Sequence, residues 1–341
     1  MVMAKKHSLG DLKAKAHALA LLIPKDKLHR SVRTWADACP ASEVWSVAFS
    51  GGADSLALLL LIWAHWPSKR KKLAALHFDH RLRGKASLKD AEFAKNVAKA
   101  LGITFRTGHW SLPPKKPSEA LARDARFSFF QKVMPKLKSN SIWLGHQQDD
   151  IAETFFMRLA RGSGTAGLAA PRPLYVDPHS PTTLRPLLSL KKSEIKLALT
   201  EVKIPWREDR SNAAFTYFRN RVRLTVIPAW IEASGRDALR GAAYSRMLLE
   251  EDDEAINQWV LALKCLTPSG KLNLSKIQGK PKAVCRRALY LWLNKQPRIG
   301  RLSARGFETL LAAVMVAVPT KQSLGVDGFA VITRQWLFFR K

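Results

Sequence analysis

The chain has 341 residues, 47% of them hydrophobic, which is enough for a folded core and for two domains. Its 57 lysines and arginines against 27 acids give a net charge of +30, so we expect a polyanionic partner, nucleic acid before an acidic membrane surface. The three scattered cysteines, Cys39, Cys265 and Cys285, exclude a disulfide framework and a sulfur-rich metal site.

Helical spacing of apolar side chains in residues 9–38 predicts a helical N-terminal extension, assigned to residues 1–40. No apolar run there ends in a small-residue cleavage site, so we predict no signal peptide. The longest apolar stretch, residues 56–66, is too short to span a bilayer. Unpaired thiols fit a reducing compartment, so we expect a cytoplasmic protein with no membrane partner.

From residue 45 the pattern alternates between strands, predicted at 46–49, 73–78, 104–107 and 141–144, and helices, predicted at 56–66, 88–101 and 118–136. This alternation predicts an α/β fold with a mostly parallel, doubly wound sheet, and we assign residues 41–225 to a catalytic domain. Ligands of such sheets bind beyond the C-terminal ends of the strands. Ser50, Asp79 and His146 all follow predicted strands, so we expect them to share a site.

The last third of the chain is predicted to be a smaller, mainly helical, basic domain over residues 226–341, with a terminal β-hairpin within 326–339. Before it, residues 171–186 contain five prolines and are predicted to form a loop, followed by a helix at 190–201. Residues 255–307 contain eleven lysines or arginines and no acid. We expect this stretch to contact the polyanionic partner, with a solvated helical face as the alternative.

The first motif is Ser50-Gly51-Gly52-Ala53-Asp54-Ser55, between a predicted strand and a predicted helix. Glycines allow a tight turn and the helix start offers unpaired N–H groups, a combination that suits phosphate. Asp54 could hold a Mg²⁺ ion that bridges phosphates. The alternative is a plain helix cap. The motif is not of the Walker type, because no lysine stands in the required place.

The second motif follows the next strand and contains His77, Asp79, His80, Arg81 and Arg83. We expect one of the two arginines to meet phosphate and Asp79 to orient a ligand. A metal site at the two histidines is weakly indicated, and a purely structural turn is the alternative.

The third motif runs from His146 through Asp150 to Glu153 and Thr154. On a helix that starts near residue 148, Asp150 and Glu153 share one face. A histidine near paired carboxylates suits acid–base chemistry or charge balancing of Mg²⁺ and an amine. The alternative is that acids simply favour a helix N-terminus. A fourth segment, residues 206–223, carries arginines that either bind phosphates or pair with acids.

Together these motifs resemble the tRNA(Ile)-lysidine synthetase family of the PP-loop (N-type) ATP pyrophosphatases. The resemblance covers about residues 45–225 and rests on residues 50–55, 79–83, 119–123, 146–154, 158–168, 185–188, 208–212 and 219–221. The chain departs from the family pattern at Arg81, where glycine is common, and at Gln147, where a second histidine is frequent.

The resemblance implies an adenine nucleotide α-hydrolase-like fold that uses ATP and Mg²⁺. It implies adenylation of C2 of the wobble cytidine in tRNA(Ile) with a CAU anticodon. The ε-amine of free L-lysine then attacks C2 to give lysidine, with release of pyrophosphate and AMP.

The resemblance also assigns residues. The implied ATP-binding residues are Ser50, Gly51, Gly52, Asp54, Ser55 and Asp79, with Asp54 also binding the metal. The implied lysine-binding residues are Asp150 and Glu153, and the implied catalytic residues are His146, Asp150, Arg123 and Arg219. From the charge of the C-terminal part, we expect tRNA to be bound by Lys276, Lys280, Lys282, Arg286 and Arg287.

Two alternatives stay open. A PP-loop tRNA thiolase shares this core but usually needs catalytic cysteines or a cluster, and no cysteine here lies in a motif. A non-catalytic RNA-binding relative is the second alternative. The absence of a glutaminase portion disfavours an amidotransferase. A homodimer is open, as is the role of the N-terminal forty residues.

Overall fold

The computed structural model describes residues 11–82, 84–114, 118–177, 180–208, 217–296, 302–325 and 328–341. The chain divides into two compact units, Met1–Met247 and Leu248–Lys341, so the first unit extends beyond the predicted catalytic domain at both ends. No helix in the described residues has the length and apolar character needed to cross a bilayer.

The first unit is built on a six-stranded sheet with the strand order β3-β2-β1-β4-β6-β5. β1 to β4 and β6 are parallel to their neighbours, and β5 alone runs antiparallel. This arrangement confirms the predicted mostly parallel α/β sheet. The strands are β1 (Trp45–Ala48), β2 (Leu73–Asp79), β3 (Thr104–His109), β4 (Ser141–Trp143), β5 (Leu174–Asp177) and β6 (Ser180–Leu184).

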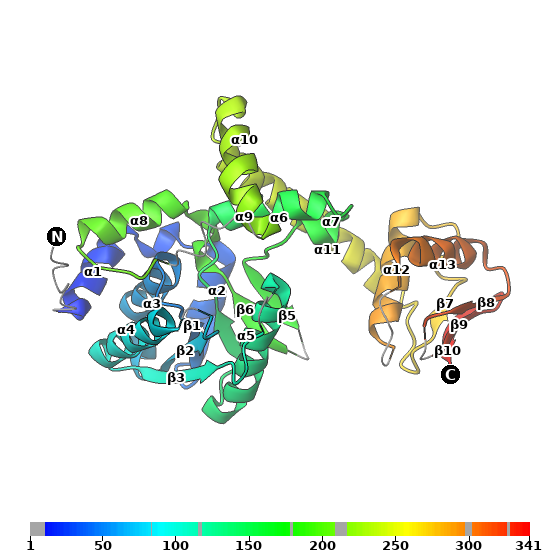
Figure 1. The fold of residues 1–341 in the computed structure, drawn as a ribbon. Coiled ribbons are helices and arrows are strands. Elements are labelled where there is room, and N and C mark those ends of the chain that lie inside the picture. Colours follow the sequence, from blue (N-terminus) through cyan, green and yellow to red (C-terminus); the bar gives the residue numbers. More distant parts are fainter. Residues whose placement is uncertain are drawn as a thin grey trace. The chain divides into compact units, whose positions relative to one another are not determined.

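Alternate side chains of the central strands enter two cores, as a sheet covered on both faces requires. Val47 and Trp143 pack into one core, and Leu76 and Ile142 into the other. Figure 1 shows α3 (Ala53–His65) and α4 (Lys85–Leu101) on one side of the sheet and α5 (Glu119–Val133) on the other.

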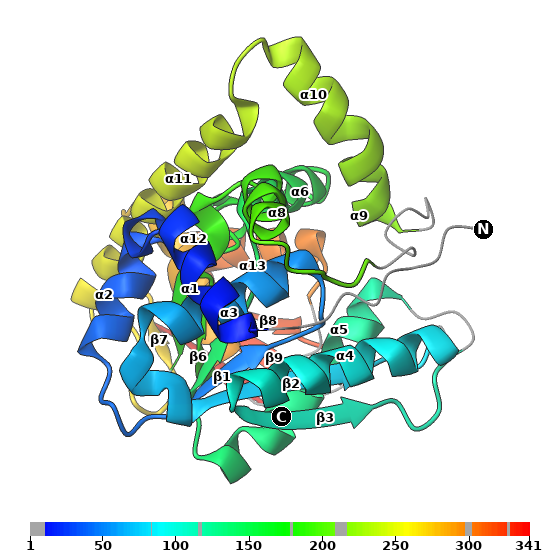
Figure 2. The ribbon, with the colours of Figure 1, turned by 90° about the vertical axis from the view of Figure 1, so that its left-hand side faces the viewer.

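The N-terminal helices form a further layer on α3. α1 (Leu12–Leu22) contacts both α3 and α8 (Lys192–Glu201), as Figure 2 shows. α3 is therefore covered by the sheet on one side and by helices on the other, which explains why almost all its residues are buried and apolar. α2 (Arg30–Ala38) completes the helical lead-in that the spacing of residues 9–38 predicts.

The proline-rich segment 171–186 is not a loop, so that prediction is wrong. It contains β5 and β6, and β6 pairs with β4 from Thr182 onward. Pro181 lies between two paired positions, Ser180 and Thr182, beside a register shift in β5. A proline is tolerated there because the ladder needs no donor from it.

The remaining elements of the first unit surround the strand ends. The helices are α6 (Gln148–Leu159), α7 (Thr165–Leu168), α9 (Phe218–Arg221), a π-helical turn (Val222–Val226), α10 (Ile227–Ser234) and α11 (Ala238–Ala262), which continues into the second unit. Short 3₁₀ helices occupy Lys25–Lys27, Pro67–Lys72, Pro135–Leu137 and Pro186–Ser189.

The second unit contains a four-stranded antiparallel sheet, ordered β7-β10-β9-β8, so the prediction of a mainly helical domain is wrong. The predicted terminal hairpin is present as β9 and β10, and two further strands flank it. β7 has two residues and β8 is Thr-Lys-Gln-Ser, so neither has an apolar alternation of its own. The elements are β7 (Leu272–Asn273), β8 (Thr320–Ser323), β9 (Phe329–Ile332), β10 (Trp336–Arg340), α12 (Lys282–Asn294) and α13 (Ala304–Val316).

Candidate active site

The motif residues of the first unit meet at one edge of the sheet. Ser50 follows β1, Asp79 ends β2, His146 follows β4 and Arg185 follows β6. Because these four strands are parallel and adjacent, their C-terminal ends lie side by side. The helical connections change direction between β1 and β4, which is where open α/β sheets bind ligands.

The glycine turn is held by two serine hydroxyls. Ser55 Oγ lies 3.0 Å from Ser50 Oγ, accepts a hydrogen bond from the Ser50 N–H at 3.2 Å and donates to the Gly52 carbonyl at 3.1 Å. Gly51 has φ +87°, a conformation that favours glycine. The turn leads directly into α3, whose first N–H groups have no partner within the helix. These groups can receive a phosphate.

Two neighbours close around this turn. A Cβ atom on Gly145 would lie 3.0 Å from the Asp54 carbonyl carbon and the Ser55 nitrogen, so only glycine lets the end of β4 approach α3 this closely. Arg207 donates its backbone N–H to the Gly51 carbonyl at 2.9 Å. Its Nε donates to Asp90 on α4 at 2.6 Å, which ties the turn to that helix.

Asp54 brings a buried carboxylate to the start of α3. Its Oδ1 is buried and has no hydrogen-bond partner among the described residues. Burial raises the pKa of Asp54 to about 6, with Asp150 adding to the shift and Lys192 opposing it. An unsatisfied carboxylate oxygen beside a phosphate cradle fits a Mg²⁺ ligand, because this ion takes one or two carboxylates and completes its shell with phosphates and water.

His146 lies in a cluster of arginines. Arg185 Nε donates to His146 Nδ1 at 3.2 Å. Burial and then the charges of Arg185, Arg219, Arg123 and Arg126 hold the pKa of His146 well below its usual value. The imidazole is therefore neutral, and with Nδ1 accepting, its Nε2 carries the proton. This histidine can donate a hydrogen bond, while the surrounding guanidinium groups supply the positive charge.

Asp150 and Glu153 lie on one face of α6, as predicted, and both are buried. Asp150 Oδ1 accepts from Arg219 at 2.5 Å, and its Oδ2 accepts from the Gln147 N–H at 2.9 Å. Glu153 accepts from Arg219 at 2.6 Å and from Arg223 at 2.5 Å. Burial lowers the pKa of Arg219, but the two carboxylates outweigh burial and raise it above its usual value.

Their two neighbours in this motif have structural roles. Asp149 Oδ2 accepts the backbone N–H of Lys192 at 3.0 Å and so caps α8. Gln147, which departs from the family pattern, caps α6 by accepting from the Asp149 N–H at 2.6 Å. The motif therefore divides into residues that hold helix ends and residues that face the site.

The turn after β2 is tighter than its sequence suggests. Arg81 has φ +54°, which explains why glycine suits this position, and its N–H donates to Asp79 Oδ1 at 2.7 Å. His77 binds the Phe49 carbonyl through Nδ1 at 2.9 Å and joins β2 to β1. Among the described residues, no group of three His, Cys, Asp or Glu side chains could hold a metal ion. The structure therefore gives no support to a metal site at His77 and His80. Arg83 lies outside the described residues, as do Asp209 to Asn212.

In the second unit, Arg287 differs from the other predicted RNA-binding residues. It forms an ion pair with the buried Asp253 and donates to Asn257, both on α11. Lys282 and Arg286 share Glu308 on α13 at 3.4 and 2.8 Å, and Lys276 donates to the Lys264 carbonyl at 3.1 Å. The contacts of Arg287 are those of a structural residue.

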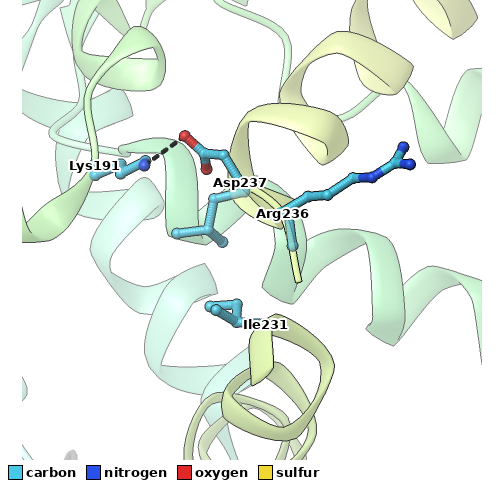
Figure 3. A pocket seen from close by; sticks show the side chains of 6 residues that line it. Lys191, Ile231, Arg236 and Asp237 are labelled. Carbon is cyan, nitrogen blue, oxygen red and sulfur yellow. Dashed lines mark hydrogen bonds and ion pairs between the residues drawn. The ribbon is translucent and has the colours of Figure 1, made fainter. Parts of the chain in front are cut away.

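A cavity of about 220 Å³ lies between the start of α8 and the α10–α11 connection. Its lining comprises Lys191, Ile231, Arg236, Asp237, Ala238 and Leu239 (Figure 3). Lys191 and Asp237 pair at 2.6 Å, and the Arg236 side chain points away from them. None of the predicted site residues lines this cavity.

Comparison with known proteins identifies the family. The family model described as PP-loop domain matches residues 24–230. The chain belongs to the PP-loop domain family. This PP-loop chain is 40% identical over 183 residues to the tRNA(Ile)-lysidine synthase of Solibacter usitatus, covering 54% of this chain and 40% of that protein. It is 34% identical over 220 residues to the tRNA(Ile)-lysidine synthase of Bacillus thuringiensis subsp. konkukian, covering 62% and 45%. It therefore spans less than half the length of these relatives.

A solved structure shares the fold of this PP-loop protein. The U34-tRNA thiolase NcsA from Methanococcus maripaludis, with its [4Fe-4S] cluster, superposes with a TM-score of 0.53 and is 16% identical. The superposition covers 70% of this chain and 79% of the thiolase. At this identity the similarity establishes the architecture alone.

Four arginines of this PP-loop site received no individual role from the sequence: Arg126, Arg185, Arg207 and Arg223. They lie on four different segments, and only the packing of those segments brings them to the strand ends. Arg185 lies in the motif 185–188, and Arg207 and Arg223 lie in the fourth segment, residues 206–223, which is the one signal that the sequence offers for them.

Proposed function

We propose that this protein is a tRNA(Ile)-lysidine synthase. The observation that carries the proposal is the pair of buried carboxylates, Asp150 and Glu153, at the same sheet edge as the glycine turn, in a chain similar to proteins of that name. In the proposed reaction, the C2 oxygen of the wobble cytidine attacks the α-phosphorus of ATP and pyrophosphate leaves. The ε-amine of lysine then attacks C2, and AMP departs with that oxygen.

The glycine turn and the first turn of α3 would hold the triphosphate of ATP. Ser50, Gly51, Gly52 and Ser55 offer backbone and hydroxyl donors, and the helix dipole favours negative charge. Asp54 would hold Mg²⁺, which when bound neutralises charge on the phosphates. Asp79, at the neighbouring strand end, is the remaining proposed contact to ATP.

Asp150 and Glu153 would receive the side-chain ammonium of lysine. Asp150 is already paired with Arg219, and Glu153 is paired with Arg219 and Arg223, so the site holds positive charge before any substrate arrives. A lysine ammonium that enters must share or replace the Arg219 contact. The released guanidinium would then be available for the negative charge that develops at the adenylate, beside Arg123 and the neutral His146.

The cations of the second unit would hold the tRNA through its phosphates. Lys276, Lys280, Lys282 and Arg286 are the proposed contacts, and the ion pair of Arg287 with Asp253 supports a structural role instead. The family resemblance further proposes tRNA(Ile) with a CAU anticodon and free L-lysine of the cytoplasm as the partners.

A thiolase reaction is disfavoured by where the cysteines lie. Cys39 contacts Trp45, the first residue of β1, at the sheet edge opposite the site. Cys265 and Cys285 are buried in the core of the second unit. Cys39 is at the opposite edge of the sheet and the other two thiols are buried, which disfavours sulfur transfer by any of them.

The test is nucleoside mass spectrometry of a tRNA(Ile) transcript with a CAU anticodon after incubation with the protein, ATP, Mg²⁺ and lysine. We expect lysidine in place of the wobble cytidine, and AMP formation that depends on both tRNA and lysine. An Asp150→Asn variant, which can still cap α6, should raise the KM for lysine at least tenfold and leave the KM for ATP within a few-fold. Glu232→Gln, an exposed residue of α10, is the control. Added sulfur, or no modified nucleoside, would reject the proposal.

A further inference from the structure

The C-terminal sheet has one face in the core and one face outside it. Along β9 and β10, Ala330, Ile332 and Leu337 are buried in the core of the second unit. The alternate residues Phe329, Val331, Trp336 and Phe338 are only partly buried and are not part of that core. Figure 1 shows α12 and α13 on one side of this sheet. The outer face thus presents three partly exposed aromatic rings that lie outside the core of the second unit.

These rings are interleaved with cations. Lys321 Nζ lies 3.7 Å from the centre of the Phe329 ring, and Lys271 Nζ lies 5.8 Å from that of Phe338. Arg340 is exposed and stands opposite Phe329 in the β10–β9 register. The described residues of the four strands include no acid. A ligand that covers this face must therefore be negatively charged and must offer flat surfaces to the rings.

The register places the two phenylalanines at a useful spacing. Phe338 pairs with Val331 and Arg340 pairs with Phe329, so the two rings are diagonal neighbours on adjacent strands. Such neighbours lie roughly 7–8 Å apart. Lys321 pairs with Val331 and extends the Phe338 row to β8. This is the arrangement of sheets that stack successive unpaired bases on aromatic side chains while cations follow the backbone.

We propose that the outer face of the β7–β10 sheet binds unpaired nucleotides of an RNA by stacking on Phe329, Phe338 and Trp336, with Lys271, Lys321 and Arg340 contacting phosphates. This surface is separate from Lys276, Lys280, Lys282 and Arg286, which are proposed to contact phosphates alone. It adds a second contact region for the proposed tRNA substrate, and in that respect it rests on the proposed function. A base that stacks on Phe329 or Phe338 takes the position that a lysine ammonium holds over that ring.

The test compares binding of two fluorescent RNAs to the full chain by anisotropy: a short unstructured single strand and the duplex of the same sequence. Phe329→Leu and Phe338→Leu should each weaken single-strand binding about tenfold and change duplex binding little, because only unpaired bases can stack. Phe338→Tyr keeps an aromatic ring and should bind as the wild type does. Tyr290→Leu, which removes an exposed aromatic from α12, should also leave single-strand binding unchanged.

Unchanged single-strand binding by both leucine variants, with thermal unfolding like that of the wild type, would overturn the inference. Equal losses for single strand and duplex would overturn it as well. If the wild type is a dimer by light scattering and the leucine variants are monomers with unaltered RNA binding, the face is instead a contact between copies. Lysidine formation is measured separately, so its absence rejects the proposed function without deciding this surface.

Discussion

Asp54 is a carboxylate whose position costs stability. Its pKa in the folded protein, about 6, lies above the ordinary value of 3.8, so the folded state binds the proton more tightly than the unfolded chain. Ionised Asp54 therefore destabilises the fold above about pH 6, and the penalty vanishes below about pH 4. Such a cost is expected at a site that needs a negative charge for a cation.

We predict that Asp54→Asn stabilises the protein at about pH 8 by roughly 2–3 kcal/mol and has almost no effect near pH 4. The same variant should lose Mg²⁺-dependent ATP turnover. Urea unfolding at the two pH values measures the first effect and AMP formation the second. A stability difference that is the same at both pH values would mean that the charge of Asp54 is not its cause.

Glu153 is almost fully buried and faces two guanidinium groups. Removing its charge leaves Arg219 and Arg223 without their shared partner, and unpaired buried charges cost several kcal/mol. We predict that Glu153→Gln lowers the free energy of unfolding by about 3 kcal/mol. Glu232→Gln, exposed on α10, should change it by less than about 0.5 kcal/mol. Chemical denaturation of both variants checks this, and similar values for the two would show that Arg219 and Arg223 re-pair elsewhere.

At the scale of residues, the sequence was informative where a motif was contiguous. His146, Asp150 and Glu153 were predicted together because they follow one strand within eight residues. Arg185 receives no role of its own, and Arg207 is only one of several arginines in residues 206–223 expected to bind phosphates or pair with acids. Nothing local distinguishes a guanidinium that reaches a strand end from one in solvent. The protonation state of His146 cannot be predicted from the sequence either, since it depends on arginines from three distant segments.

At the scale of elements, the predicted strands match β1 to β4 to within a few residues, because short runs rich in apolar, aromatic and β-branched residues between turn residues are strong local signals. β5 and β6 are not predicted because the five prolines in and around them suggest a loop. The pairing of β6 with β4, and of β5 with β6, is what makes them strands. The close approach of β4 and α3 at Gly145 could not be predicted either, although the glycine itself was visible.

This approach gives a prediction at the element scale. In Gly145→Ala the added Cβ would meet backbone atoms of Asp54 and Ser55 at 3.0 Å, and backbone of a helix start cannot swing aside. We expect α3 to shift, ATP affinity to fall about tenfold and stability to fall by about 1–3 kcal/mol. Gly164→Ala is the matched control, because nothing lies within 4 Å of its added Cβ and its φ of −80° suits alanine. Calorimetric ATP titration measures the affinity of each variant and thermal unfolding its stability. Equal changes in Gly145→Ala and Gly164→Ala would show that the close approach of Gly145 to α3 does not determine either property.

At the scale of the whole molecule, the net charge supports a firm prediction, whereas the architecture of the second unit could not be predicted from the sequence. The net charge of +30 indicates a polyanion whatever the fold. The sequence predicts only two of the four strands of the antiparallel sheet, because the other two, β7 and β8, are short and largely polar. A hairpin alone has no defined inner and outer face, so the outer face of the sheet could not be predicted either.

The charge leads to a prediction that separates contact residues from structural ones. Binding of the tRNA transcript should weaken steeply with salt, each phosphate contact adding roughly one unit to the slope of log K against log salt. Lys280→Ala should lower that slope by about one unit without changing stability. Arg287→Leu should instead remove the ion pair of the buried Asp253 and lower the free energy of unfolding by about 3 kcal/mol. Its salt slope, measured at a temperature where the variant is folded, should equal that of the wild type. Filter binding over a salt series measures the slopes. A lower slope for Arg287→Leu with unchanged stability would show that Arg287 contacts a phosphate and that its ion pair with Asp253 is not needed for stability.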